Sequence, residues 1–135
     1  MGRIRAAAAV IALDTNVVVR FLTRDDPAQA PRAKALMETS STFLPRTVVL
    51  EIEWVLRTTY RFDRAAVTAA LTKLLGLPGL EIEDRSIVVR ALDWCRQGLD
   101  FADALHLATS AQAEVFATFD RTLRRRARAV AGPYR

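Results

Sequence analysis

Short apolar runs alternate with longer segments of helical periodicity along this sequence. Runs of strand length lie at Ala9–Leu13, Ser41–Leu44, Leu80–Ile82 and Val115–Phe119. The segments between them space their apolar residues three and four apart, which is typical of helices with one buried face. Strands that alternate with helices predict an α/β fold with a parallel sheet. The first run ends in a carboxylate, and it indicates a parallel strand buried on both faces.

Capping residues predict where the helices begin. Asp14 precedes a helix at residues 17–22, and Asp25-Asp26-Pro27 opens a helix through about Thr39, with proline at the first helical position. Asp63 opens a helix that runs to about Leu75, and Asp100 opens one over Phe101–Ala113. Further helices are predicted over Thr47–Tyr60, Ser86–Arg96 and the strongly basic segment Arg121–Arg128.

The composition favours one soluble globular domain. The chain has 135 residues, of which 51% are hydrophobic and 26% charged, enough to bury a real core. We expect residues 10–135 to form this domain, behind a loose leader at residues 1–9. The net charge of +5 favours acidic partners, of which nucleic acid is the commonest. The single cysteine, Cys95, excludes an internal disulfide and fits a reducing cytoplasm.

Two carboxylates follow predicted strands and are candidates for a functional site. Asp14 ends the first strand and Asp120 ends the last one. In open α/β sheets, ligands bind outside the carboxyl ends of the strands, so both side chains are expected to face one crevice. Each residue alone is weak evidence, because aspartate is also a common cap and turn residue.

Asp103 is a third candidate acid. It lies three residues after Asp100, so Asp100 can cap the helix while Asp103 occupies its first turn. A helix N-terminus favours a carboxylate by up to about 1 kcal/mol, and capping alone therefore explains either residue. The segment around Asp103 is otherwise small and apolar, however, and an acid on such a buried helix needs a partner. We therefore assign Asp103 to the site and leave Asp100 as a cap with an accessory role open.

Glu51 is the fourth acid, and it has to be distinguished from Glu53. Two residues two apart on a helix differ by about 200° in direction, so only one can face the site. Glu53 lies four residues before Arg57, the favourable spacing for an exposed ion pair. Glu51 shares its stripe with apolar residues, which predicts that Glu51 points inward and Glu53 outward.

Clustered carboxylates indicate a metal. Acids held a few Å apart cannot all stay ionised without a compensating cation, and a hard divalent ion such as Mg²⁺ or Mn²⁺ takes oxygen ligands. Such ions activate water and bind phosphoryl oxygens. Arginines beside Asp120, namely Arg121, Arg124 and Arg125, are candidates for holding a phosphate backbone, although a solvated basic helix face is the better explanation for any one of them alone.

Other chemistries find little support in the sequence. The single histidine, His106, lies on an apolar helix, where a core or interface position is expected. No arrangement for nucleophilic catalysis, no zinc-binding cluster and no glycine-rich phosphate loop is present. Trp54 and Trp94 suggest core or dimer packing rather than base stacking.

The sequence resembles the PIN-domain family, most closely the VapC toxins of bacterial type II toxin–antitoxin systems. Four segments carry the resemblance, in the family's order and at suitable spacing: VIALDTNVVVRFL, RTVVLEIEWVLRTTY, DFADALHLA and ATFDRTLRR. The resemblance covers nearly the whole chain from Ile11 to about Arg128. It departs from the family in the extension Met1–Ala9, since close relatives tend to begin near Val10.

The resemblance implies a three-layer α/β/α sandwich around a short parallel sheet and cleavage of RNA by a Mg²⁺- or Mn²⁺-dependent endoribonuclease. It implies that Asp14, Glu51, Asp103 and Asp120 fill the family's four acidic positions, and that Asn16 and Thr118 are accessory polar residues. It also implies a homodimer held inactive by a cognate VapB-type antitoxin.

Two alternatives remain open at this stage. A housekeeping PIN nuclease that matures RNA would have the same acids. A receiver-type phospho-acceptor domain is also α/β with acids at strand ends, but it needs a lysine near the last strand. The only lysines are Lys34 and Lys73, which disfavours that interpretation.

Overall fold

The computed structural model describes residues 9–39 and 41–131. Within them, seven helices surround a short sheet. The elements follow in the order β1 (Ile11–Ala12), α1 (Thr15–Thr23), α2 (Gln29–Thr39), β2 (Thr42–Leu44), α3 (Arg46–Thr58), α4 (Arg64–Leu75), β3 (Leu80–Ile82), α5 (Arg85–Arg96), α6 (Phe101–Thr109) and α7 (Arg121–Ala131). The expected α/β class is confirmed.

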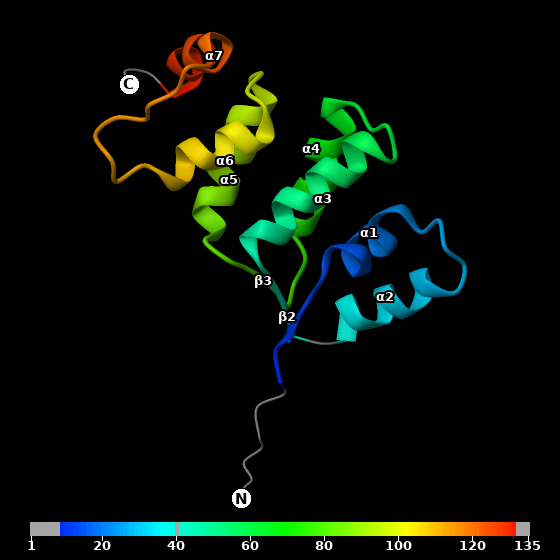
Figure 1. The fold of residues 1–135 in the computed structure, drawn as a ribbon. Helices are drawn as coiled ribbons and strands as arrows, with labels where there is room; N and C mark the ends of the chain where they lie inside the picture. Colours follow the sequence, from blue (N-terminus) through cyan, green and yellow to red (C-terminus); the bar gives the residue numbers. More distant parts are fainter. Residues whose placement is uncertain (1–8, 40, 132–135) are drawn as a thin grey trace, which may run out of the picture.

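The sheet is parallel throughout, as the sequence predicts. Its strand order is β1-β2-β3, with Ile11 opposite Thr42 and Thr42 opposite Leu80. Figure 1 shows α1 and α2 together on one side of the molecule, with α5 and α6 on the other and α3 and α4 between them. The short strands meet below these helices, so the carboxyl end of each strand leads directly into the helical part of the fold.

Side-chain caps set several helix starts, as predicted. The Asp14 carboxylate accepts a hydrogen bond from the Thr15 amide at 2.8 Å, and Asp63 accepts one from the Ala66 amide, also at 2.8 Å. These bonds satisfy amides that have no partner inside their own helix. The helix α2 begins at Gln29, two residues later than expected, because the Asp26 carboxylate caps it from outside the helix.

The first strand is not buried on both faces, and that expectation is wrong. Both residues of β1 are exposed, and Val10 before it is 60% exposed. The physical reason is that β1 pairs with β2 alone among the described residues, which makes it an edge strand. Only Leu13, just beyond it, reaches the core.

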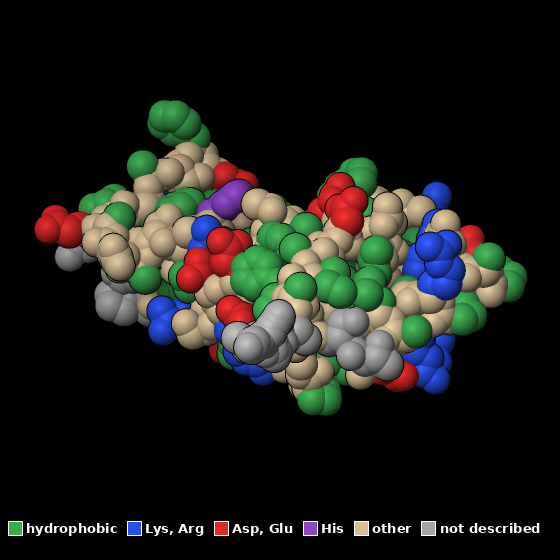
Figure 2. All heavy atoms as spheres, turned by 90° about the horizontal axis from the view of Figure 1, so that it is seen from below, with side chains coloured by type: hydrophobic (Ala, Val, Ile, Leu, Met, Phe, Trp, Pro, Cys, Tyr) green, Lys and Arg blue, Asp and Glu red, His purple; other side chains and the backbone are tan. Residues whose placement is uncertain are grey.

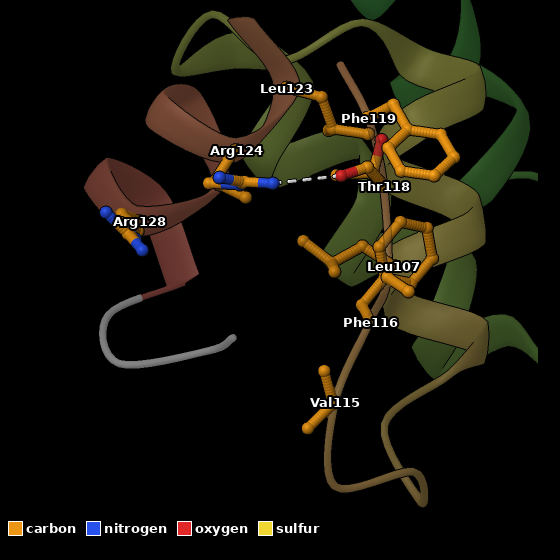
Figure 3. A pocket seen from close by; sticks show the side chains of 10 residues that line it. Leu107, Val115, Phe116, Thr118, Phe119, Leu123, Arg124 and Arg128 are labelled. Carbon is orange, nitrogen blue, oxygen red and sulfur yellow. Dashed lines mark hydrogen bonds between the residues drawn. The ribbon is translucent and has the colours of Figure 1, made fainter. Parts of the chain in front are cut away.

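No strand forms at Val115–Phe119, which the sequence predicted to be the last strand. These residues instead form an extended connection from α6 to α7, with Phe119 fully exposed and Val115 59% exposed. Strand preference is expressed only where a neighbouring strand and a packed face are available. These residues pair with no strand of the described sheet, and Phe116 alone among them packs against the core. Figure 3 shows the connection running beside α6, where Arg124 of α7 donates a hydrogen bond to the Thr118 carbonyl at 3.0 Å.

The core lies between the helices and the inner face of the sheet. Its largest fully buried side chains include Leu44 of β2, Ile52 and Leu56 of α3 and Phe101 of α6. The helix α6 packs closely on α5 and also contacts α3. The acidic N-terminal turn of α6 is therefore anchored by apolar packing further along the helix. No helix in the described part of the chain has the length and apolarity needed to cross a membrane.

Replacing Ile52 by alanine is expected to destabilise the fold by about 2–5 kcal/mol, because a fully buried side chain leaves a cavity behind. Val89→Ala is the control, since this β-branched side chain on α5 is 44% exposed and its loss should cost well under 1 kcal/mol. Denaturant titration followed by circular dichroism measures both. Equal losses in the two variants would contradict the assigned core.

Candidate active site

Asp14 and Glu51 meet through Thr15, at the point where β1 leads into α1. Thr15 occupies the first turn of α1, and its hydroxyl donates a short hydrogen bond to the Glu51 carboxylate of α3. Both acids line one cavity of about 390 Å³. Thr15 and Glu51 are 36 positions apart in the sequence. Their hydrogen bond brings together Asp14 and Glu51, two of the four predicted site residues. Thr15 was not among the expected site residues.

The opposite wall of this cavity is a fixed polar network. Arg20 donates a hydrogen bond to the Tyr60 hydroxyl at 2.9 Å, and that hydroxyl donates one to the Asp25 carboxylate at 2.9 Å. Hydrogen bonds from Thr23 and Tyr60, with the charge of Arg20, lower the pKa of Asp25 below its ordinary value. Asn16, a predicted accessory residue, lines the same cavity. The cavity is therefore lined by two acids and by a cation, Arg20, that is already paired with Asp25.

The predicted orientation of the two glutamates is reversed. Glu53 is buried, 4% exposed, and Glu51 is exposed. The expected pair between Glu53 and Arg57 does form, at 2.9 Å, and its neutralising charge allows Glu53 to lie against the core. The buried face of α3 carries Val49, Ile52, Glu53 and Leu56. Glu51 lies at the edge of that face, and it reaches the cavity because it faces α1 rather than the core.

Asp103 lies in the first turn of α6, as expected. The Asp100 carboxylate caps the helix by accepting a hydrogen bond from the Asp103 amide at 3.2 Å. Asp103 is half-buried, and burial raises its pKa above the ordinary value. The negative charges of Asp100 and Asp120 raise this pKa further, while His106 lowers it. These three aspartates therefore act on one another electrostatically.

Asp120 caps α7 rather than ending a strand. Its carboxylate accepts a hydrogen bond from the Leu123 amide at 3.0 Å. Thr118, another predicted accessory residue, accepts a hydrogen bond from the Asp120 amide through its hydroxyl, also at 3.0 Å. The two residues thus fix each other's backbone at the start of α7. Asp120 is exposed, and its effect on the pKa of Asp103 places the two charges near each other.

The four predicted acids form two groups instead of one. Within residues 9–39 and 41–131, no three acidic, histidine or cysteine side chains lie close enough to hold a metal ion. Glu51 links the groups, since it lines the cavity with Asp14 and also a second one with Ala102, the neighbour of Asp103. Figure 2 shows acidic side chains in separate places on one face, one of them beside the single histidine.

The donor chemistry of these residues fits a hard divalent cation. Carboxylate oxygens are the ligands that Mg²⁺ and Mn²⁺ prefer. The pKa of Asp103 is raised first by burial and then by the charges of Asp100 and Asp120. The positions of the acids, however, place only two of them, Asp14 and Glu51, around one cavity, and not three or four. The site fits the cation in ligand type and not in ligand number.

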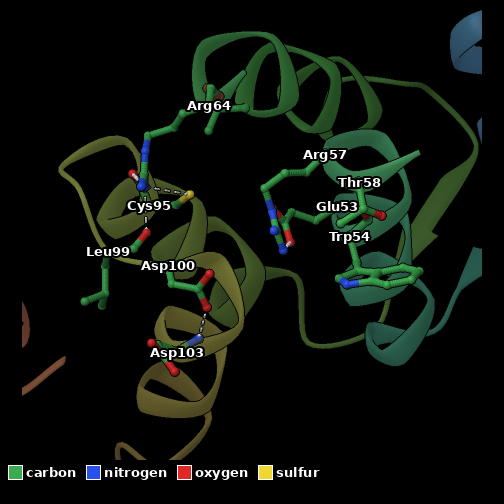
Figure 4. A network of polar contacts seen from close by, with 10 residues as sticks. Glu53, Trp54, Arg57, Thr58, Arg64, Cys95, Leu99, Asp100 and Asp103 are labelled. Atoms are coloured by element: carbon green, nitrogen blue, oxygen red, sulfur yellow. Dashed lines mark hydrogen bonds and ion pairs between the residues drawn. The ribbon is translucent and has the colours of Figure 1, made fainter. Parts of the chain in front are cut away.

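A network of polar contacts lies beside the start of α6 (Figure 4), with Glu53 and Cys95 buried and Arg57, Arg64 and Asp100 exposed. Arg64 donates hydrogen bonds to the backbone carbonyls of Cys95 and Leu99, at 2.7 and 2.8 Å, which holds the turn that leads into Asp100. The pKa of Arg57 is raised, first by its bond to Glu53 and also by the charge of Asp100. The burial of Cys95 raises the pKa of its thiol. Arg64 thus fixes the backbone directly before Asp100, and no sequence motif marks Arg64.

The basic residues proposed to bind phosphate are on the surface of α7. Arg121, Arg124 and Arg125 are all exposed, and Arg124 is held by its bond to the Thr118 carbonyl. His106 is exposed rather than in the core. Trp94 packs against the core as expected, whereas Trp54 is 55% exposed.

Comparisons with known proteins give one family match and one similar solved structure. The PIN domain family matches residues 11–129 of the chain. No curated protein matches it. Among solved structures, the chain is similar to VapC20 of Mycobacterium tuberculosis, a toxin that cleaves the sarcin–ricin loop, with 20% sequence identity and a TM-score of 0.42. That likeness covers 92% of this chain and 95% of VapC20.

The raised pKa of Asp103 predicts a specific dependence of stability on pH. A carboxyl group that binds its proton more tightly in the folded chain favours folding below its unfolded pKa, near 3.8. This contribution is lost as the pH rises through the folded pKa. Asp103→Asn should therefore raise the free energy of unfolding at neutral pH and change it little at low pH, as measured by denaturant titrations in a chelating buffer. A lower stability at neutral pH would contradict the assigned electrostatics.

Proposed function

Because the chain belongs to the PIN domain family, we propose that it is a metal-dependent endoribonuclease that hydrolyses RNA phosphodiesters. The observation that best supports this function is the cavity shared by Asp14 and Glu51, with their helices joined by the hydrogen bond from Thr15. Two carboxylates in one open cavity at the carboxyl end of a parallel strand are suited to a cation and a polyanionic substrate.

Each acid has a proposed role in the site. By the resemblance to the family, Asp14 and Asp103 would be the principal ligands of Mg²⁺ or Mn²⁺, and Glu51 and Asp120 would complete the ligand set directly or through water. Of these acids, the described residues bring only Asp14 and Glu51 into one cavity. Asn16, Thr118 and Asp100 orient these acids, which for Thr118 and Asp100 is supported by their hydrogen bonds to the amides of Asp120 and Asp103. The bound ion supplies activation of water and neutralisation of phosphoryl charge.

The chain's own residues bind and position the substrate. The net charge of +5 attracts a polyanion over a distance, and Arg121, Arg124 and Arg125 of α7 extend from the helix that Asp120 caps. We assign these arginines to the RNA backbone on one side of the acids. A contact of this kind gives affinity without sequence preference.

The biological role that we propose is that of the toxin in a type II toxin–antitoxin pair. The support is the resemblance of four segments to the VapC toxins, given above. We accordingly propose a cytoplasmic homodimer that a VapB-type antitoxin keeps inactive. A housekeeping nuclease is the alternative, and expression of the chain alone separates the two roles, because only a toxin arrests growth.

Asp14→Asn and Asp103→Asn should each lower RNA cleavage by about a hundredfold or more, because even residues that only support a metal ligand change activity by about 10–100-fold. Both variants should also remove growth inhibition on expression. Asp93→Asn is the matched control, since Asp93 is an exposed carboxylate on α5 that contacts only Gln97 through its side chain. Cleavage of a labelled single-stranded RNA measures the effect, and wild-type activity in Asp14→Asn would refute the site.

Removal of divalent cations should abolish cleavage reversibly. Dialysis against a chelator is expected to eliminate activity, and Mg²⁺ or Mn²⁺ should restore it, because carboxylates select hard cations. The same additions should raise the thermal unfolding temperature of the wild type and leave that of Asp14→Asn unchanged. Full activity in excess chelator would eliminate the metal mechanism.

A further inference from the structure

A second cavity, of about 520 Å³, opens between α1 and α2. The helix α1 contributes Asn16, Val17 and Arg20 to it, and α2 contributes Gln29, Arg32, Ala33 and Leu36. These positions lie one helical turn apart on each helix, so the two helices present one face each to the cavity. We call this space the α1–α2 cleft.

The lining of the α1–α2 cleft combines an apolar floor with a polar rim. Ala33 is buried, and Val17 and Leu36 are half-buried. Arg32, Gln29 and Asn16 are exposed, and they supply guanidinium and amide groups around the opening. No acidic side chain lines this cleft, in contrast to the neighbouring cavity of Asp14 and Glu51.

The two arginines of the cleft differ in whether their guanidinium groups already have partners. Arg20 is neutralised, since it donates hydrogen bonds to Gln29 and Tyr60 and pairs with Asp25 at 3.6 Å. Arg32 has no hydrogen bond or ion pair with any residue in the described ranges 9–39 and 41–131. The cleft therefore holds one cation that is free to bind an anion, beside another that is fixed in the wall.

The α1–α2 cleft adjoins the cavity of the acids. Asn16 and Arg20 line both spaces, and Asn16 lies two residues from Asp14 on the first turn of α1. A chain that passes the acids therefore reaches the cleft within a short distance. The arrangement separates the charges, with carboxylates where a phosphodiester would be cleaved and an uncommitted guanidinium beside it.

We propose that the α1–α2 cleft binds a nucleotide of the RNA next to the cleaved bond, with Arg32 on its phosphate and the base against Val17 and Leu36. This proposal rests on the proposed function. Single-stranded RNA is recognised by bases that leave the stack, pack on a side-chain surface and form hydrogen bonds at their edges. The amides of Asn16 and Gln29 offer both donors and acceptors for such an edge.

The shape of the cleft favours a nucleotide over a phosphate ion. A site for an ion alone needs only convergent donors, whereas this cleft is large enough for a small organic ligand and has an apolar floor that a phosphate would leave uncovered. Arginine suits the nucleotide as well, because its planar guanidinium binds phosphate through paired donors and stacks on bases.

Steady-state kinetics on a short single-stranded RNA test the role of Arg32. Arg32→Ala should raise KM about tenfold, as expected for loss of one charge-assisted contact, and leave kcat nearly unchanged. The salt dependence of binding should fall by about 0.7 in its logarithmic slope, the amount expected for one phosphate contact to a single strand. Arg90→Ala, which removes an exposed arginine of α5 with no partner in the described residues, is the matched control.

Competition distinguishes the possible ligands of the cleft. A nucleoside monophosphate should displace a labelled RNA from the Asp14→Asn protein, which binds without cleaving, at concentrations where inorganic phosphate has little effect. Arg32→Ala in the same background should weaken this displacement, and Arg90→Ala should not. Equal competition by phosphate would overturn the nucleotide site in favour of a simple anion site.

The outcomes separate this proposal from the proposed function. If the wild type cleaves RNA and Asp14→Asn does not, while Arg32→Ala matches the wild type in KM, the cleft proposal is wrong and the nuclease remains. If Arg32→Ala weakens binding of a VapB-type peptide and not of RNA, the cleft binds protein instead. If the wild type cleaves no RNA, the proposed function itself fails.

Discussion

The hydrogen bond from Thr15 to Glu51 is the contact on which the arrangement of the candidate site depends. It joins the first turn of α1, directly after β1, to the side of α3. Because Asp14 caps the same turn of α1, this one contact brings two carboxylates from distant parts of the sequence to one cavity. The same helix carries Arg20, which lines both this cavity and the α1–α2 cleft.

Local signals in the sequence predict most of the helices and strands, because the start of a helix or strand depends on residues that are close along the chain. A carboxylate that caps a helix acts within three residues, and the caps at Asp14, Asp63 and Asp100 were recognised for that reason. The strand at Leu80–Ile82 and the parallel pairing followed from apolar runs between helices. Asp14, Asp103 and Asp120 lie at these same boundaries between elements, whereas Glu51 lies in the middle of α3 and is assigned through its helix face and the resemblance.

The features that were predicted wrongly depend on partners elsewhere in the fold. The residues 115–119 have strand character, yet a strand needs a neighbour, and the described structure gives β1 a partner on one side only. The pair between Glu53 and Arg57 predicts an exposed Glu53, but the pair forms with Glu53 packed against the core and only Arg57 exposed. The α1–α2 cleft could not be foreseen either, since it exists only where two helix faces meet.

The distribution of charge connects the stability of the domain with its proposed activity. Burial and, after it, the neighbouring aspartates raise the pKa of Asp103, so at neutral pH the ionised Asp103 opposes folding. Two charged pairs elsewhere already neutralise each other, namely Glu53 with Arg57 and Arg20 with Asp25. These pairs do not need a ligand to balance their charge. Near the candidate site, the acids Asp14 and Glu51 line one cavity and Arg32 lines the adjoining cleft, and Asn16 lines both spaces. A bound cation would neutralise the acids, and a bound phosphate would neutralise Arg32. RNA bound together with its metal ion supplies both the cation and the phosphate.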